Sequence, residues 1–118
     1  MALSACNAGP WPSGDVHATQ VRAHGLRATA EQLDAAAARV GARADELVYE
    51  GPAGERFRAS VHELRDELRR EAGRIRTVAH VLSRAAGTLL EQQRAWQRRT
   101  AEFERQAADD RARRAAGR

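Results

Sequence analysis

The chain has 118 residues, of which 31% are charged and only 4% aromatic. So few large side chains exclude a compact mixed domain with a thick core, and the composition is typical of long amphipathic helices. The net charge is +4, every basic residue is an arginine, and sixteen of the twenty arginines follow residue 55. One thin-cored domain is therefore expected, and we expect a second chain to complete its core.

Residues 1–14 contain two prolines, two glycines and one tryptophan, which predicts a flexible or loosely docked N-terminal arm. A single cysteine, Cys6, excludes an internal disulfide. No apolar run approaches the ~20 residues of a membrane span. No charged segment followed by an apolar stretch resembles a signal peptide. The expected location is the bacterial cytoplasm, and any export would proceed without a cleaved signal peptide.

A first helix is predicted over residues 15–48. Its apolar positions recur at alternating spacings of three and four residues, and large side chains alternate with alanine. Alanine at every second layer lets two helices approach closely. The positions are Val16, Thr19, Ala23, Leu26, Ala30, Leu33, Ala37, Val40, Ala44 and Leu47.

A tight turn is predicted over residues 49–52, with the sequence Tyr-Glu-Gly-Pro. Gly51 can adopt the backbone angles that leave one helix and cap the next. Pro52 suits the first position of a helix, where a missing N–H costs nothing. The turn therefore predicts that two helices fold back on each other.

A second helix is predicted over residues 53–107, and its main apolar line repeats every seven residues. Further apolar residues on both sides make a stripe wide enough for a multi-helix bundle. The main line is Val61, Leu68, Ile75, Leu82, Leu89, Trp96 and Phe103, flanked by Phe57, Leu64, Val78 and Ala85 and by Ala72, Ala79 and Ala86. The charged tail, residues 108–118, lacks an apolar period and is expected to fray.

The second helix is predicted to be much longer than the first, which ends opposite about residues 85–88. The apolar residues near or beyond that point are predicted to bind a partner: Leu82, Leu89, Leu90, Trp96 and Phe103. Either the N-terminal arm packs Leu3 and Trp11 there, or another protein does. Because two helices cover each other on one side only, dimerisation is expected.

No arrangement of side chains predicts an enzyme, a cofactor site or a metal site. His17 and His24 lie two helical turns apart, and no His-x-x-x-His or Glu-x-x-His pair exists. Neither Ser60 nor Ser83 has an evident base beside it. The arginines at 65, 69, 70, 74 and 76 are interleaved with acidic residues, which weakens their net field and disfavours nucleic-acid binding.

The turn and its surroundings, residues 47–57, resemble the centre of the W-x-G helical-hairpin proteins. These are the early-secreted-antigen-like substrates of the type VII (ESX) secretion system. Gly51, Ala53 and Phe57 match the family's pattern, and Tyr49 stands where the family has tryptophan. The resemblance implies a hairpin that pairs into an antiparallel four-helix bundle and is often exported as a folded dimer.

The family's export signal, Tyr-x-x-x-Asp/Glu near the end of the second helix, is absent here. Trp96 is followed at that offset by Thr100, and Phe103 by Ala107. In such systems one partner can carry the signal for both. The use of arginine without lysine is typical of GC-rich genomes such as those of actinobacteria.

The sequence thus predicts an all-α fold, a long antiparallel helical hairpin that completes a four-helix bundle by dimerisation. The first functional hypothesis is a non-enzymatic, type VII secretion-associated hairpin that binds an identical copy or a second W-x-G-like hairpin. A secretion component or chaperone is a further possible partner. The alternative is a cytoplasmic coiled-coil scaffold or regulator that binds nucleic acid or anionic membrane through its arginine-rich second helix.

Overall fold

A computed structural model describes residues 9–46 and 50–117 of the chain. They form two helices, α2 (Val16–Glu46) and α3 (Gly51–Ala116), and the described ranges contain no strand. The predicted all-α class is therefore confirmed. The structure divides into two units, His17–Arg84 and the terminal unit of Met1–Val16 with Ala85–Arg118.

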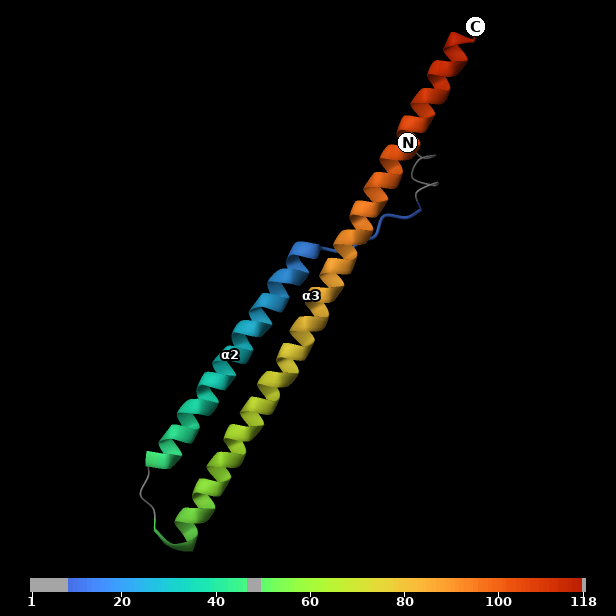
Figure 1. The fold of residues 1–118 in the computed structure, drawn as a ribbon. Coiled ribbons are helices and arrows are strands. Elements are labelled where there is room, and N and C mark those ends of the chain that lie inside the picture. Colours follow the sequence, from blue (N-terminus) through green and yellow to red (C-terminus); the bar gives the residue numbers. More distant parts are fainter. Residues whose placement is uncertain (1–8, 47–49, 118) are drawn as a thin grey trace. The chain divides into compact units, whose positions relative to one another are not determined.

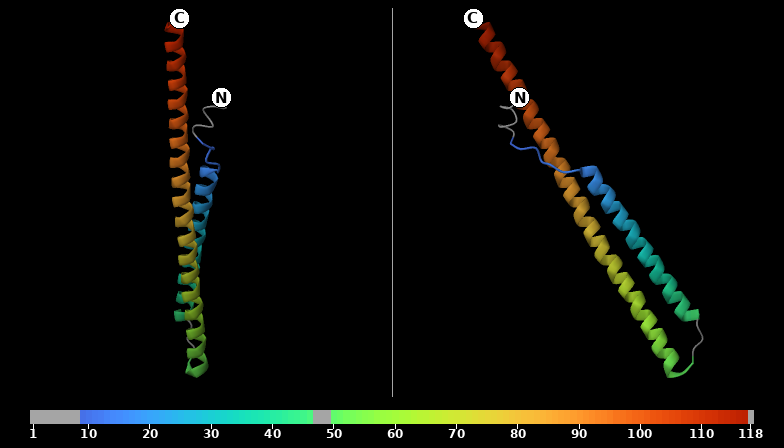
Figure 2. Two further views of the ribbon diagram at one scale, coloured as in Figure 1. Left: turned by 90° about the vertical axis from the view of Figure 1, so that its right-hand side faces the viewer. Right: turned by 180° about the vertical axis from the view of Figure 1, so that it is seen from behind.

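In the unit His17–Arg84, α2 and the first part of α3 lie side by side and run in opposite directions (Figures 1 and 2). This confirms the predicted antiparallel hairpin. Its seam, the line along which the helices meet, consists of alanines spaced seven residues apart, each at most 1% exposed. Alanine adds little bulk at each crossing, so the two backbones can approach closely. The seam alanines are Ala23, Ala30, Ala37 and Ala44 of α2 and Ala72 and Ala79 of α3.

Within the single chain, the predicted core line of α3 does not form the direct contact between the two helices. Leu68, Ile75 and Leu82 were expected at its centre, yet they are only half-buried, whereas Ala72 and Ala79 are fully covered. The physical reason is that the alanine line faces the other helix directly. The larger side chains lie to one side of it, where two helices cannot enclose them.

Polar contacts on the other side of the seam define how the helices align. The Arg76 guanidinium pairs with the Asp34 carboxylate, and Arg27 Nη2 donates to Ser83 Oγ at 2.7 Å. Because residue numbers rise along α2 as they fall along α3, these contacts place Ala30 level with Ala79. In the same alignment Ala37 lies level with Ala72.

The helix boundaries differ from those predicted. α3 begins at Gly51, whose φ of 84° is the left-handed conformation expected of it, while Tyr49 lies outside the described residues. α3 also continues to Ala116, beyond its predicted end at residue 107. The segment is rich in Ala and Arg, which favour helix without any apolar period. An ion pair of 3.3 Å between Asp110 and Arg113 adds to it.

In the terminal unit, residues 9–14 lie against α3 (Figure 2). These residues contact side chains between Leu89 and Trp96. Leu3 and Cys6 lie outside the described residues. The prediction that the arm could bring Trp11 to this part of the second helix is confirmed.

Candidate protein-interaction surfaces

The hairpin carries its larger apolar side chains on one side only. On one side of Ala30 lie Leu33, three residues after it, and Leu26, four residues before it. On the other side lie Asp34, four residues after it, and Arg27, three residues before it. Since the polar side chains of the two helices bond to each other, the apolar sides of both helices face the same way.

The same asymmetry holds on α3. From Ala79, Leu82 and Ile75 lie on one side, and Ser83 and Arg76 lie on the other. We call the apolar side the hairpin face. It consists of Leu26, Leu33 and Val40 of α2 and Leu64, Leu68, Ile75, Val78 and Leu82 of α3.

Much of the hairpin face is open to solvent. Leu64 is 48% exposed and Val78 is 51% exposed, while the other members are half-buried. Scattered apolar residues are normal on a surface, but contiguous rows along two helices mark an interaction site. This face is the strongest candidate for binding another protein.

Near the turn, the hairpin face deepens into a hollow between the two helices. Val40 and Ala44 of α2 and Phe57 and Val61 of α3 line it, and its volume is about 320 Å³. Arg39 and Arg43 complete the lining on the α2 side. The hollow could take one apolar side chain of a partner, with the two guanidinium groups beside it.

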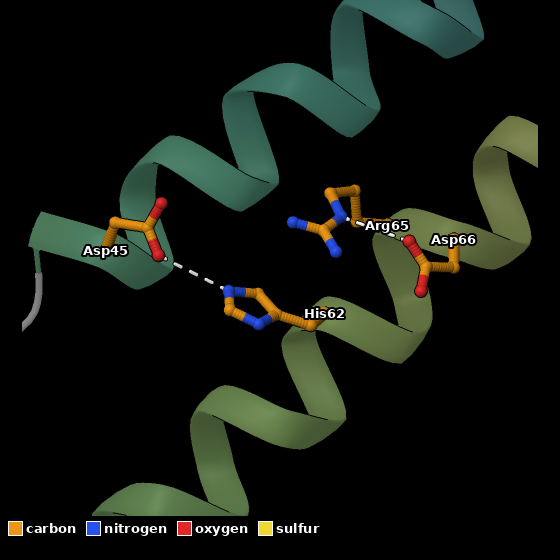
Figure 3. A network of polar contacts seen from close by, with 4 residues as sticks. All are labelled: Asp45, His62, Arg65 and Asp66. Atoms are coloured by element: carbon orange, nitrogen blue, oxygen red, sulfur yellow. Dashed lines mark hydrogen bonds and ion pairs between the residues drawn. The ribbon is translucent and has the colours of Figure 1, made fainter.

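The opposite side of the hairpin is polar. In Figure 3, Asp45 of α2 and His62 of α3 point toward each other, with Asp45 Oδ1 3.3 Å from His62 Nε2. Arg65 is anchored by Asp66, with Nε 3.1 Å from Oδ1, and a Cβ at Gly41 would lie 3.1 Å from its Cδ. Gly41 therefore leaves room for the Arg65 side chain between the helices.

Several arginines of the predicted basic stretch have acidic partners. Arg65 pairs with Asp66 and Arg76 with Asp34, while Arg74 Nη1 lies 2.9 Å from Glu71 Oε2. Such pairing reduces the positive field that a polyanion would meet. This part of α3 therefore resembles a salt-bridged helix surface more than a nucleic-acid interface.

A second candidate surface lies in the terminal unit, where the arm contacts α3. The Trp96 indole N–H donates to the Gly9 carbonyl at 3.0 Å. Its ring also meets that of Trp11 edge to face, with centroids 5.1 Å apart and an angle of 83°. Gln93 Nε2 donates to the Pro12 carbonyl at 3.0 Å and to the Gly14 carbonyl at 3.2 Å.

Leu89 contacts the arm at Gly14. A Cβ on Gly14 would lie 2.5 Å from Leu89 Cδ2. The φ of Gly14, 143°, also favours glycine. Leu89, Gln93 and Trp96 stand at spacings of four and three residues, so one stretch of α3 presents all three to the arm. One turn beyond Trp96, the Thr100 hydroxyl oxygen is buried and has no hydrogen-bond partner within the described part of the chain.

The structure distributes the predicted site residues over both surfaces. Leu82 belongs to the hairpin face, whereas Leu89 and Trp96 contact the arm. The other two predicted partner-binding residues, Leu90 and Phe103, are half-buried on α3. Pro52 and Ala53 of the predicted turn motif are exposed in the first turn of α3, and Phe57 is 46% exposed.

Sequence reasoning missed Gln93. A signal for it existed, because Gln93 continues the seven-residue line of Ala72, Ala79 and Ala86. At this position glutamine stands in place of alanine, and it donates to carbonyl groups of the arm.

The described residues contain no group of three or more potential metal ligands. His17, His24 and His80 are exposed, and His62 contacts Asp45 as described. Neither described helix has a stretch long and apolar enough to cross a membrane. No family model, curated protein or solved structure matches the chain.

Proposed function

We propose that the chain is a non-enzymatic protein-binding module that pairs through its hairpin face with a second helical hairpin. The observation that carries this proposal is the one-sided distribution of apolar side chains over α2 and α3. Leu64 and Val78 are about half exposed although they continue the rows beside a fully buried seam. A second pair of helices laid on this face would complete a four-helix bundle.

We propose an identical copy as the first partner. A two-fold dimer joins the same patch of both subunits, so the patch must complement itself. The hairpin face meets this condition in its apolar rows, which run along both helices and can pack against the same rows of a second copy. Charged residues of both signs flank these rows, with Arg39 and Arg43 beside Val40 and with Glu67, Glu71, Arg70 and Arg74 beside Leu64 and Leu68.

The test is a pair of aspartate substitutions at equally exposed valines. Val78 is 51% exposed on the hairpin face, and Val21 is 55% exposed on the part of α2 turned away from it. Val78→Asp should abolish self-association in sedimentation velocity, because it would bury a carboxylate between the hairpins. Val21→Asp should leave the dimer intact. Equal behaviour of the two variants would refute the assignment of this face.

We further propose that the hairpin serves type VII secretion, as a partner of a W-x-G-like protein or of a secretion component or chaperone. The support is the resemblance of residues 49–57 to the family's turn together with a hairpin fold. The test is to compare the culture medium of the native bacterium with that of a mutant lacking the ATPase of the secretion system. Loss of the protein from the medium of the mutant would support export, and equal amounts would contradict it.

A further inference from the structure

We propose that α3 carries a recognition surface for a proline-flanked tryptophan peptide, and that the chain's own residues 9–14 occupy this surface as an internal ligand. Leu89, Gln93 and Trp96 form the surface. None of these residues belongs to the hairpin face, and the surface requires neither dimerisation nor secretion.

The internal ligand is a tryptophan between two prolines. Its sequence is Gly-Pro-Trp-Pro-Ser-Gly. Proline fixes its own φ near −65°, and Pro12 restricts the backbone of Trp11, the residue before it. The centre of the segment therefore loses less entropy on binding than a segment without proline, and its carbonyl groups can accept hydrogen bonds.

The side chains of α3 match this ligand in kind. Indole and amide N–H groups donate to the backbone carbonyls of residues 9, 12 and 14, and the Trp96 ring receives Trp11. Aromatic rings combined with donors to peptide carbonyls are the usual means of reading proline-rich segments. The position of Gly14 adds selectivity, because its φ of 143° is a conformation that residues with a Cβ rarely adopt.

These contacts are few enough for the arm to be exchanged. Between the described residues they include three hydrogen bonds, one aromatic pair and the contact of Leu89 with Gly14, and Trp11 remains 44% exposed. A peptide in solution must nevertheless compete with an arm tethered at a high effective concentration, which is of millimolar order for short linkers. The surface should therefore bind such a peptide once the arm's own tryptophan is removed.

The experiment uses the full-length chain carrying Trp11→Ala and a fluorescently labelled hexapeptide with the sequence of residues 9–14. Fluorescence anisotropy should show saturable binding to this variant and weaker binding, by up to about tenfold, to the unmodified chain. A hexapeptide with alanine in place of tryptophan should bind about two- to tenfold more weakly, because it lacks the aromatic pair. Far-UV circular dichroism confirms that the variant remains helical.

Gln93 and its neighbour Gln92 provide the matched control. Gln93 contacts the arm, whereas Gln92 is exposed. Added to Trp11→Ala, Gln93→Ala should weaken peptide binding about tenfold, as expected for two lost hydrogen bonds, while Gln92→Ala should not change it. Failure of the Trp11→Ala chain to bind the peptide better than the unmodified chain would overturn the proposal. Equal effects of the two glutamine substitutions would overturn it as well.

Discussion

Replacing Ala37 with leucine tests whether the alanine seam determines how closely α2 and α3 approach. Ala37 is 0% exposed and lies level with Ala72, which is also 0% exposed. Ala38, the next residue, is exposed and serves as the matched control. Both substitutions add the same three carbons to α2, and alanine and leucine are both strong helix formers.

The magnitude follows from the burial of the site. If the seam could open freely, burying three more carbons would favour folding by about 2.4 kcal/mol. Opening it, however, separates the neighbouring layers at Ala30 and Ala44, which are also covered. Over-filling such a packed contact typically costs about 1–3 kcal/mol net. For a unit of this size the expected fall in melting temperature is roughly 5–20 °C.

The assay is thermal unfolding followed by circular dichroism at 222 nm, a wavelength that reports helix content. All variants are compared at one protein concentration, because association would shift the transition. Ala38→Leu should change stability by less than about 0.5 kcal/mol. An Ala37→Leu protein as stable as the unmodified chain would show that the seam tolerates large side chains, and the close-packing argument would then be wrong.

Three further predictions concern single positions. A Cβ at Gly25 or Gly73 would meet no atom within 4 Å. Gly25→Ala and Gly73→Ala should therefore each raise the free energy of unfolding by roughly 0.5–1 kcal/mol in the same thermal unfolding assay. A loss of stability would mean that these glycines have a packing role. Gly51 has a φ of 84°, so Gly51→Ala should lower stability by about 1–2 kcal/mol, and no change would argue against that backbone conformation. The side chains of Asp34 and Arg76 are 39% and 45% exposed. Asp34→Ala should therefore lower the free energy of unfolding by less than about 1 kcal/mol, and this loss should become smaller in added salt. A loss that does not depend on salt would contradict a screened ion pair.

The hairpin could be predicted from the sequence because its signals are local and repeated. The seven-residue spacing of Ala23, Ala30, Ala37 and Ala44 marks the contact stripe of α2, and Gly51 marks where the chain reverses. For α3, hydrophobicity alone favoured the leucine line over the alanine line. The choice between them depends on the distance between the helices, and no single stretch of sequence encodes that distance.

The arm and the end of α3 were harder to predict, for different reasons. The contacts of Gln93 and Trp96 join residues about eighty positions apart, and such pairings leave no periodic signal. The helix beyond Ala107 depends on the intrinsic preferences of Ala and Arg, which an apolar pattern does not reveal. Of the predicted partner-binding residues, Leu89 and Trp96 contact the arm, which covers part of each side chain.

The most direct test of the proposed pairing is the mass of the protein in solution, measured by light scattering coupled to size exclusion. One chain has a mass of 13.0 kDa. A dimer through the hairpin face predicts twice that mass for the unmodified chain and for Val21→Asp, and a single-chain mass for Val78→Asp. A helical chain that remains at 13.0 kDa at every concentration tested would contradict pairing with an identical copy.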